Sequence, residues 1–544
     1  MKTQTIAPNA AIETSTANQQ PKGESQMSRI NSLMWKLVSI APKAALLAIV
    51  VVGSLAVSPM ASAQACSYWW PNNPVISYPG QWVTPSGTLY GISGGVYIQT
   101  YADSGNFTFV PPFNQVSYNG VVVGASGTGV WLPPSPMSVA FHAQVPYTAT
   151  AGETTNVTMA LYDLYGNLLC TTTVTVKVGS ESPALSTEMN TIGHHDEVDE
   201  YYKGVDFNVY QLSWPGTWNT ANITQLSGGP IFDALSPIAS QVDATYNREE
   251  VFYLDPSQNV WEAYFDGTAW SSHNLTSLVG APAARPGSPI VSVVNPYAGS
   301  IQLNYLDSSG HIQQMWSWDR KMWFGNDLTS QTGAPNAAAN SPLFTLNDTA
   351  QDSIEVYYLD TNNYVRGLSF SSSGGWVYLN PSPAGVWPAA SGSALVSVVN
   401  PYAGSVQVNY VDSAGHVDQL YSWNRTTWYG GQVLAGAPNA APGSGLATEV
   451  NTIAGTVEVY YLDSTQTVSE LWWDGRWQFS NPTVGTGAAN AAAGSPVVSL
   501  VNTRANTVQV HYIAPDKHVH ELWWNGSWHA DDVTLAAGAY PAIP

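Results

Sequence analysis

Hydrophobic and polar positions alternate along short segments of the chain, most clearly near its C-terminus. The last four alternating segments are 496–501, 508–512, 518–524 and 527–532, and Asn525-Gly526 separates the final two. Alternation with a period of two is typical of a strand that buries one face, and Asn-Gly is a strong hairpin signal. The pattern therefore predicts four short antiparallel strands joined by tight turns.

This four-strand pattern repeats seven times between residues 183 and 544. One tryptophan marks each copy, at spacings of 49 to 53 residues: Trp218, Trp270, Trp323, Trp376, Trp428, Trp477 and Trp528. A tyrosine that ends an alternating strand recurs with almost the same spacing: Tyr202, Tyr253, Tyr305, Tyr358, Tyr410, Tyr461 and Tyr512. Four strands per repeat of this length indicate a propeller, whereas a helical solenoid would show a period of 3.6 residues. We predict an all-β chain in which residues 183–544 form a seven-bladed β-propeller.

A different pattern covers residues 64–180. Short β-branched and aromatic runs, such as 95–100, 139–143 and 171–178, are broken there by Gly, Pro, Ser and Asn. We predict a β-sandwich-like domain for this part of the chain. Its role is open between a spacer, a dimer contact and a second binding module.

Residues 1–63 have the pattern of a signal peptide. Basic residues precede an apolar run from Ala44 to Val57, and Ala61-Ser62-Ala63 then fits the small-residue cleavage pattern. The run is shorter than the ~20 residues that span a bilayer as a helix. We therefore expect a secreted, periplasmic or cell-surface protein without a membrane span. An uncleaved signal anchor is the alternative, and a start at Met27 or Met34 would give a more usual signal length.

Composition excludes several other classes of protein. Only 10% of the residues are charged and 12% are aromatic, which excludes disorder for most of the chain. The formal net charge is −21, so we predict no nucleic-acid partner. Cys66 and Cys170 are the two cysteines, and in an exported chain they predict one disulfide, with two free thiols as the alternative. The acidic segment 194–200 is interpreted as a solvated turn rather than a metal site, and we predict neither a metal nor a cofactor.

The seventh repeat shows a family resemblance. The run 518–529, followed by Asp532-Val533-Thr534 and Ala537-Gly538-Ala539, resembles the repeat of bacterial seven-bladed fucose-binding propeller lectins, distant relatives of the six-bladed fungal fucose lectins. The resemblance implies shallow sugar sites between blades, in which a carboxylate of one blade bonds hydroxyl groups and tryptophans of the next blade stack on the sugar. In the six-bladed relatives an arginine also bonds the sugar. Here that neighbourhood holds Gln509, Glu458 or Glu250, which leaves the identity of the sugar open.

The residues themselves suit sugar binding, because a pyranose offers an apolar face and a rim of hydroxyl groups. The acidic position is glutamate in three repeats, and pairing each with the next blade gives Glu262 with Trp318 and Trp323, Glu470 with Trp524 and Trp528, and Glu521 with Trp214 and Trp218. The same position is Gln211, Gln314 and Gln419 in three other repeats and Gly367 in the fourth. Blade packing is the alternative role for the tryptophans, and an interblade hydrogen bond is the alternative for the glutamates.

Together these observations predict a multivalent carbohydrate-binding protein, a lectin for fucose or a related sugar whose partners are glycans or glycoconjugates. The oligomeric state is open. Two alternatives remain: a propeller scaffold or adhesin without sugar binding, and a glycoside hydrolase, since two carboxylates at a catalytic distance can come from any two strands. The sequence favours a non-enzymatic lectin, because the Glu or Gln and Trp positions repeat.

Overall fold

The computed structural model describes the strands between residues 67 and 178 with a few adjoining residues, and residues 182–191, 197–383 and 385–543. The predicted signal peptide, residues 1–63, lies outside the described residues. Cys66 does too, so its bridge to Cys170 stays a prediction. Within the described part of the chain, no helix has the length and apolar character needed to cross a bilayer.

Two β-sheets come from residues 67–178. The first has the order β1-β4-β9-β6-β7, with β3 also paired to β9, and the second has the order β2-β11-β10-β5-β8. Their strands are β1 (Ser67–Trp69), β2 (Val75–Ser77), β3 (Trp82–Val83), β4 (Ser86–Tyr90), β5 (Val96–Ala102), β6 (Val110–Tyr118), β7 (Val121–Gly124), β8 (Val130–Leu132), β9 (Met137–Gln144), β10 (Thr154–Tyr162) and β11 (Leu168–Val178). In β11 the valines 174, 176 and 178 are buried and the residues between them are not, which confirms the period-two prediction there. Packing of the two sheets as a sandwich stays a prediction.

Seven four-stranded sheets follow, each built from four consecutive strands. We number them sheet one to sheet seven in chain order. Sheets one to three contain β12 (Leu185–Asn190), β13 (Glu197–Lys203), β14 (Val209–Trp214) and β15 (Asn219–Asn222); β16 (Ile238–Asp243), β17 (Arg248–Leu254), β18 (Val260–Phe265) and β19 (Trp270–Asn274); and β20 (Ile290–Asn295), β21 (Ser300–Leu306), β22 (Ile312–Ser317) and β23 (Phe324–Asp327).

Sheets four to seven continue the series in the same way. They contain β24 (Leu343–Asp348), β25 (Ser353–Leu359), β26 (Val365–Ser371) and β27 (Gly375–Leu379); β28 (Leu395–Asn400), β29 (Ser405–Val411), β30 (Val417–Ser422) and β31 (Tyr429–Gln432); β32 (Leu446–Asn451), β33 (Thr456–Leu462), β34 (Val468–Trp473) and β35 (Trp477–Ser480); and β36 (Val497–Asn502), β37 (Thr507–Ile513), β38 (Val519–Trp524) and β39 (Trp528–Asp532). The four strands expected for the last repeat agree with β36–β39 to within one residue at every end.

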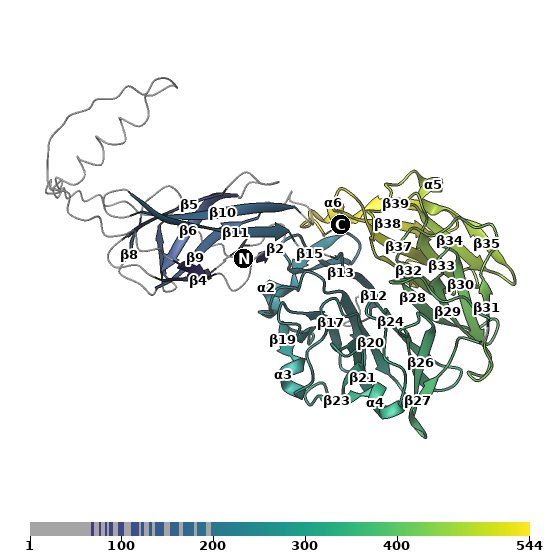
Figure 1. The fold of residues 1–544 in the computed structure, drawn as a ribbon. Coiled ribbons are helices and arrows are strands. Elements are labelled where there is room, and N and C mark those ends of the chain that lie inside the picture. Colours follow the sequence, from purple (N-terminus) through teal and green to yellow (C-terminus); the bar gives the residue numbers. More distant parts are fainter. Residues whose placement is uncertain are drawn as a thin grey trace, which may run out of the picture. The chain divides into compact units, whose positions relative to one another are not determined.

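The seven sheets form a ring. The first strand of each sheet contacts the first strand of the next, and β36 of sheet seven contacts β12 of sheet one. In Figure 1 the yellow strands of sheet seven accordingly lie beside the first strands of sheet one. Since each sheet uses its own four strands, the ring closes without a strand exchanged between the two ends of the repeat region.

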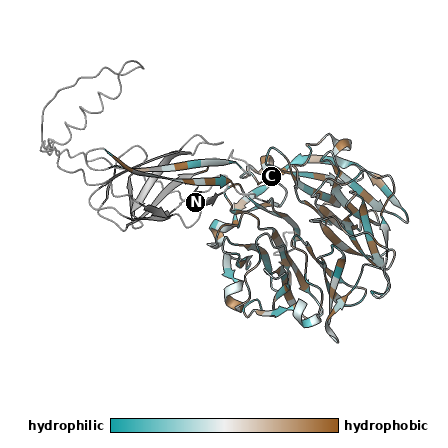
Figure 2. Ribbon diagram, in the orientation of Figure 1, coloured by the Kyte–Doolittle hydropathy of each residue, from teal (hydrophilic) through white to brown (hydrophobic). Residues whose placement is uncertain are grey.

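Apolar side chains hold neighbouring sheets together. Every residue of the second strand is buried in sheets two to seven, and brown hydrophobic stretches recur along the strands of the ring (Figure 2). Phe252 of sheet two packs in one cluster with Leu303 of sheet three. Leu212 of sheet one packs in another with Ile513 of sheet seven, so the closing interface has the same kind of core as the others.

The repeated tyrosines tie each sheet to the linker that enters it. The hydroxyl of Tyr305 donates to the carbonyl of Pro282, at 2.7 Å. Equivalent bonds, each to a carbonyl 23 residues earlier, are made by Tyr253, Tyr358, Tyr410, Tyr461 and Tyr512. Tyr202 of sheet one instead donates to the carbonyl of Tyr540, at 2.5 Å, so the C-terminal segment replaces the missing linker.

Five short helices follow fourth strands in the described part of the ring. They are α2 (Ile223–Ser227), α3 (Leu275–Val279), α4 (Leu328–Thr332), α5 (Pro482–Thr486) and α6 (Val533–Ala537), each directly after or one residue beyond a fourth strand. Asn274 caps α3 by accepting the N–H of Ser277, and Gly280 ends it with φ of 68°, a left-handed conformation that favours glycine. The hydroxyl of Thr276 accepts the N–H of Val260, which fixes the helix to the third strand.

We expect deletion of residues 540–544 to destabilise the whole ring. The deletion removes the Tyr202 bond, the bond from Ile543 N–H to the carbonyl of Lys203 and the buried Ile543 side chain. The free energy of unfolding should fall by roughly 3–6 kcal/mol. Urea denaturation measures the change, with Tyr202→Phe, which loses one hydrogen bond, as the milder comparison. Equal stability of the deleted and full chains would refute this account of ring closure.

Candidate functional site

Four pockets with a common construction lie between neighbouring sheets. Each is lined by the second, third and fourth strands of one sheet, with their loops, and by aromatic side chains of the following sheet. We name each pocket after the sheet that supplies the first set. The volumes are about 220 Å³ for the sheet-three pocket, 440 Å³ for the sheet-five pocket, 280 Å³ for the sheet-six pocket and 310 Å³ for the sheet-seven pocket.

Two positions, one on the second strand and one on the third, recur on one face of each sheet, and both are polar except in sheet four, where the third-strand residue is Gly367. In sheet six they are Glu458 and Glu470; Glu470 is opposite Tyr460, which lies two residues after Glu458, so both carboxylates share a face. We call these two positions the facing pair. By register the facing pairs of sheets one to seven are Asp199 and Gln211, Glu250 and Glu262, Gln302 and Gln314, Glu355 and Gly367, Gln407 and Gln419, Glu458 and Glu470, and Gln509 and Glu521.

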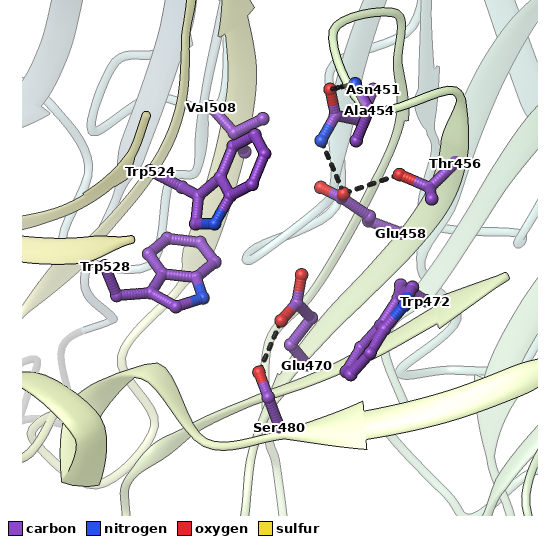
Figure 3. Close-up of a pocket in the computed structure, with 10 residues that line it drawn as sticks. All are labelled: Asn451, Ala454, Thr456, Glu458, Glu470, Trp472, Ser480, Val508, Trp524 and Trp528. Carbon is purple, nitrogen blue, oxygen red and sulfur yellow. Dashed lines mark hydrogen bonds between the residues drawn. The ribbon is translucent and has the colours of Figure 1, made fainter. Parts of the chain in front are cut away.

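The sheet-six pocket contains the predicted group of Glu470, Trp524 and Trp528. In Figure 3 the two indoles stand on one side of the cavity, opposite Glu458, Glu470 and a third indole, Trp472. Oε1 of Glu458 accepts hydrogen bonds from Asn451 at 2.7 Å and Thr456 at 2.9 Å. Oε2 of Glu470 accepts one from Ser480 at 2.5 Å. The pocket therefore combines aromatic surfaces with fixed acceptors.

Buried acidic side chains lie close together beside this pocket. Burial, and then the charge of Glu458, raise the pKa of Glu470 above its ordinary value. Burial and the same neighbouring charge raise the pKa of Glu449, a buried residue of β32. Because carboxyl groups this close repel one another when ionised, the cluster holds protons more tightly than isolated carboxyl groups do.

The sheet-seven pocket contains the second predicted group, Glu521 with Trp214 and Trp218, together with Gln509. Among the described residues, Oε1 of Glu521 is buried and has no hydrogen-bond partner, although Nε2 of His511 lies 3.7 Å away. A buried acceptor without a donor is costly, and a ligand hydroxyl would satisfy it. The tryptophans come from sheet one, so this pocket exists only when the ring is closed.

His511 provides the main positive charge near that closure. Its Nε2 lies 2.7 Å from Oε1 of Glu200 in sheet one, and both side chains are fully buried. Burial alone would lower the pKa of His511, but Glu200 and Glu521 outweigh burial and raise the pKa to about 10. His511 therefore carries a proton at neutral pH and pairs chiefly with Glu200.

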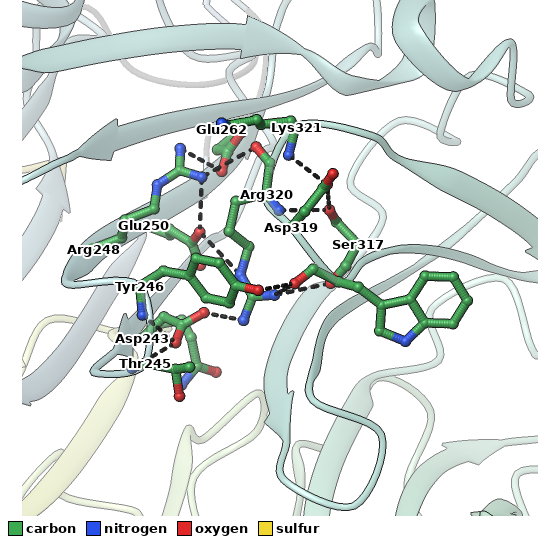
Figure 4. Close-up of polar contacts among 12 residues, drawn as sticks. Asp243, Thr245, Tyr246, Arg248, Glu250, Glu262, Ser317, Asp319, Arg320 and Lys321 are labelled. Carbon is green, nitrogen blue, oxygen red and sulfur yellow. Dashed lines mark hydrogen bonds and ion pairs between the residues drawn. The ribbon is translucent and has the colours of Figure 1, made fainter.

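The third predicted group is not assembled into one pocket. Glu262 is fully buried, and its Oε1 lies 3.5 Å from Nη2 of Arg248 (Figure 4). Its Oε2 lies 3.3 Å from Nδ1 of His273. Arg320 enters the same cluster from sheet three, pairs with Asp243 and stacks its guanidinium 4.4 Å from the ring centre of Tyr246. Protein side chains thus occupy the space beside Glu262.

Its two predicted aromatic partners lie elsewhere. Trp323 is buried in the core between sheets two and three, edge-on to Phe252. Trp318 is half exposed and lines the sheet-three pocket with Trp316. The spacing of Trp318 in the repeat could not reveal this difference, because the loop after β22 is longer than the corresponding loop after β38.

Of the seven tryptophans that mark the repeats, some are buried between sheets and others also line a pocket. Trp323 and Trp428 are buried in core clusters. Four others line pockets while their remaining surface packs inward: Trp218, Trp376, Trp477 and Trp528. Trp528, for example, contacts Tyr460 edge-on at 6.2 Å and also faces the sheet-six pocket. Core packing and pocket lining thus occur together in single residues, and contact with a sugar stays a prediction.

Glutamine pairs replace glutamates in two pockets. Gln314 lines the sheet-three pocket with Gln302, and Gln419 lines the sheet-five pocket with Gln407. Gln211 does not line any of the four pockets and donates to the hydroxyl of Tyr201, at 3.2 Å. The sequence analysis did not identify the second-strand members, Gln302 and Gln407, as pocket residues. Their fixed position in the repeat could have revealed them.

One group of side chains has metal-ligand geometry. Asp516, His518 and Asp532 bring potential ligand atoms within 4.8 Å of one another. They already satisfy each other, since Nδ1 of His518 lies 2.7 Å from Oδ2 of Asp532 and Asp532 caps α6. Of the acidic segment 194–200, residues 194–196 lie outside the described residues. Residues 197–200 belong to β13, where Asp199 and Glu200 are buried, so the interpretation as a solvated turn is wrong for them.

Comparison with known families gives one match. Residues 289–539 match the family model of the fungal fucose-specific lectins. The resemblance to fucose-binding propeller lectins is therefore confirmed for this part of the chain, which includes three of the four pockets wholly and most of the fourth. No curated protein matches the chain.

Several solved structures are similar to this one. The lectin BP39L of Burkholderia pseudomallei is 17% identical, covers 64% of this chain and 98% of its own, and has a TM-score of 0.52. AofleA of Arthrobotrys oligospora is 16% identical over 55% of this chain and 86% of its own, with a TM-score of 0.41. The six-bladed β-propeller lectin of Aleuria aurantia is 16% identical over 57% of this chain and 98% of its own, with a TM-score of 0.40. The likeness to BP39L concerns the fold, and it supports the all-β propeller class.

We expect Glu470→Gln to stabilise the protein at alkaline pH. A carboxyl group whose folded pKa is raised contributes stability below its unfolded pKa of about 4.3, and that contribution is lost as the pH rises through the folded pKa. The variant should therefore unfold with a free energy higher by on the order of 1–3 kcal/mol at pH 8 and nearly unchanged at pH 4. Urea denaturation at both pH values measures this, with exposed Asp352→Asn as the control. An equal change in the free energy of unfolding at both pH values would contradict the raised pKa of Glu470 as the cause.

Proposed function

We propose that this protein is an exported lectin that binds several copies of a glycan ligand through the pockets between its sheets, without chemically changing the glycan. The observation that carries the proposal is the repeated pairing of a polar facing pair with tryptophans of the next sheet. A unique catalytic site would not need to recur, whereas a binding surface gains from repetition.

The chemistry of each pocket suits a pyranose. Indole planes such as Trp214 and Trp218 accept the apolar face of a sugar ring. The facing pair, Gln509 and Glu521 in this pocket, offers donors and acceptors at fixed directions for the hydroxyl groups. Oε1 of Glu521 accepts no hydrogen bond from the described residues, although it lies 3.7 Å from Nε2 of His511, and it would gain a donor when the sugar binds.

Fucose or a related sugar is the ligand we propose for these sites. The matched family is the fungal fucose-specific lectins, and the Aleuria aurantia lectin is described by its mode of fucose recognition. In this chain the position of the arginine expected in that family is glutamine or glutamate at the pockets, so contacts to the sugar differ there. A glycan array probed with residues 64–544 tests the sugar class, and the absence of binding to any glycan would refute the proposal.

We expect a strong dependence on ligand density. Several shallow pockets on one rigid ring raise the effective concentration of a second sugar once the first is bound. Binding to a dense fucosylated surface should therefore be about 10²-fold tighter or more than binding to free methyl fucoside. Surface plasmon resonance at graded glycan densities, compared with calorimetry on the free sugar, measures the ratio. A ratio near one would exclude multivalent binding.

A second prediction separates a ligand contact from a structural role. Glu521→Gln should weaken sugar binding at the sheet-seven pocket and leave the melting temperature nearly unchanged, because the amide keeps the shape and loses a charge-assisted bond of ~1.5–3 kcal/mol. Glu262→Gln is the matched control: it should lower the melting temperature and leave sugar binding unchanged, because Glu262 pairs with Arg248 and His273. Calorimetry and thermal melts of both variants decide, and the reverse result would overturn the assignment of Glu521.

A further inference from the structure

The facing pairs differ in whether the protein supplies a positive charge. The Glu250–Glu262 pair of sheet two is accompanied by Arg248, at 3.7 and 3.5 Å, and by Arg320 at 3.9 Å from Glu250. Glu355 in sheet four has Arg425 at 3.7 Å. In the part of the chain that the structure describes, no lysine or arginine forms an ion pair with Glu449, Glu458 or Glu470.

Two sequence changes produce this difference. Arg248 begins β17, and Thr456 begins β33 at the same place in the repeat, where its hydroxyl lines the sheet-six pocket. Arg320 lies in the loop between β22 and Trp323, whereas the shorter loop between β38 and Trp528 holds only residues 525–527 and no arginine. In sheet two, arginine side chains thus occupy the space beside the two glutamates and pair with them. In sheet six, the two glutamates at the same positions line an open cavity.

The cavity offers what a small cation needs. Glu458 and Glu470 are each more than nine-tenths buried, and both line the pocket. In Figure 3 the Glu470 oxygen that does not bond Ser480 points into the space between Trp524 and Glu458. Trp472, Trp524 and Trp528 line the same cavity, and aromatic rings attract cations through the negative potential of their π systems. Neutral donors bond both groups, Tyr460, Asn451 and Thr456 to Glu458 and Ser480 to Glu470, but no described lysine or arginine pairs with either. Burial and the charge of Glu458 raise the pKa of Glu470 to about 8, so a positively charged ligand would displace the proton that Glu470 holds and supply the missing counter-charge.

We propose that the sheet-six pocket binds a sugar that carries a protonated amine, that is, a hexosamine without its N-acetyl group. The proposal rests on the lectin function above and gives this pocket a specificity of its own. Its ammonium group would sit between Glu458 and Glu470, and its ring would lie against the tryptophans. The Gln302–Gln314 and Gln407–Gln419 pockets have uncharged facing pairs and suit neutral sugars instead.

Three sugars that differ only at one carbon test the charge. Glucosamine, N-acetylglucosamine and glucose are titrated into the protein by calorimetry at pH 6.5, below the pKa of about 7.7–8.0 typical of such amines. We expect one class of site, with one equivalent per chain, that binds glucosamine at least about tenfold more tightly than either neutral sugar. Equal affinity for the three sugars would overturn the proposal, while leaving the lectin function to the glycan array.

Two variants assign that site to the pocket. Glu458→Gln removes one charge and keeps the acceptor for Asn451 and Thr456; Thr456→Arg supplies the internal guanidinium that sheet two has. Each should abolish the preference for glucosamine without lowering the affinity for methyl fucoside at the other pockets. Asp352→Asn changes the net charge equally at an exposed turn and should keep the preference. If both pocket variants fold, as judged by thermal melts, and retain it, the assignment is wrong.

Methylammonium chloride distinguishes an amino sugar from other amines. Tight binding of glucosamine with methylammonium at least about tenfold weaker supports a sugar ligand, because only the sugar uses the tryptophan faces. Equal binding of the two would overturn the sugar assignment and indicate a general amine site. Failure of every neutral glycan on the array would instead refute the broader lectin function, so the two failures can be told apart.

Discussion

The need to cover two apolar faces on every four-stranded sheet governs this structure. Phe252 and Leu303 meet between sheets two and three, and Leu212 and Ile513 meet between sheets one and seven, so no sheet is left with an uncovered face. A row of such sheets would leave apolar surface at both ends, and closing the ring removes both ends at once. The pockets follow from the same constraint, because they lie where the packed faces of neighbouring sheets diverge.

Within this ring of sheets, the residues of the facing pair differ from sheet to sheet. The facing pair is two glutamines in sheets three and five, two glutamates in sheets two and six, and one of each in sheet seven. Arg248 and Arg320 convert the pair of sheet two into an internal ion cluster, whereas the pair of sheet six stays open to a ligand. The same two positions can therefore either join neighbouring sheets through ion pairs, as in sheet two, or remain open to a ligand, as in sheet six.

Much of this organisation could be predicted from the repeat. The period of the tryptophans and tyrosines located every sheet, and alternation located the strands of the last repeat to within about one residue. The groups of Glu470 with Trp524 and Trp528, and of Glu521 with Trp214 and Trp218, also followed, because a regular repeat carries a given position to the same side of each sheet. These features could be predicted because the position of a strand or a hairpin depends on short segments of sequence.

What only the tertiary structure decided is which side chains fill each interface. Glu262 and Glu470 occupy the same place in the repeat, yet one is paired with Arg248 and the other borders a cavity. The difference depends partly on Arg320, which comes from the next sheet on a loop of different length, and partly on the volume left between two packed faces. Such contacts join residues about 70 positions apart in the chain, as from Arg248 to the carbonyl of Arg320. Strand periodicity fixes the side of the sheet a residue faces, whereas packing between sheets fixes what it meets there.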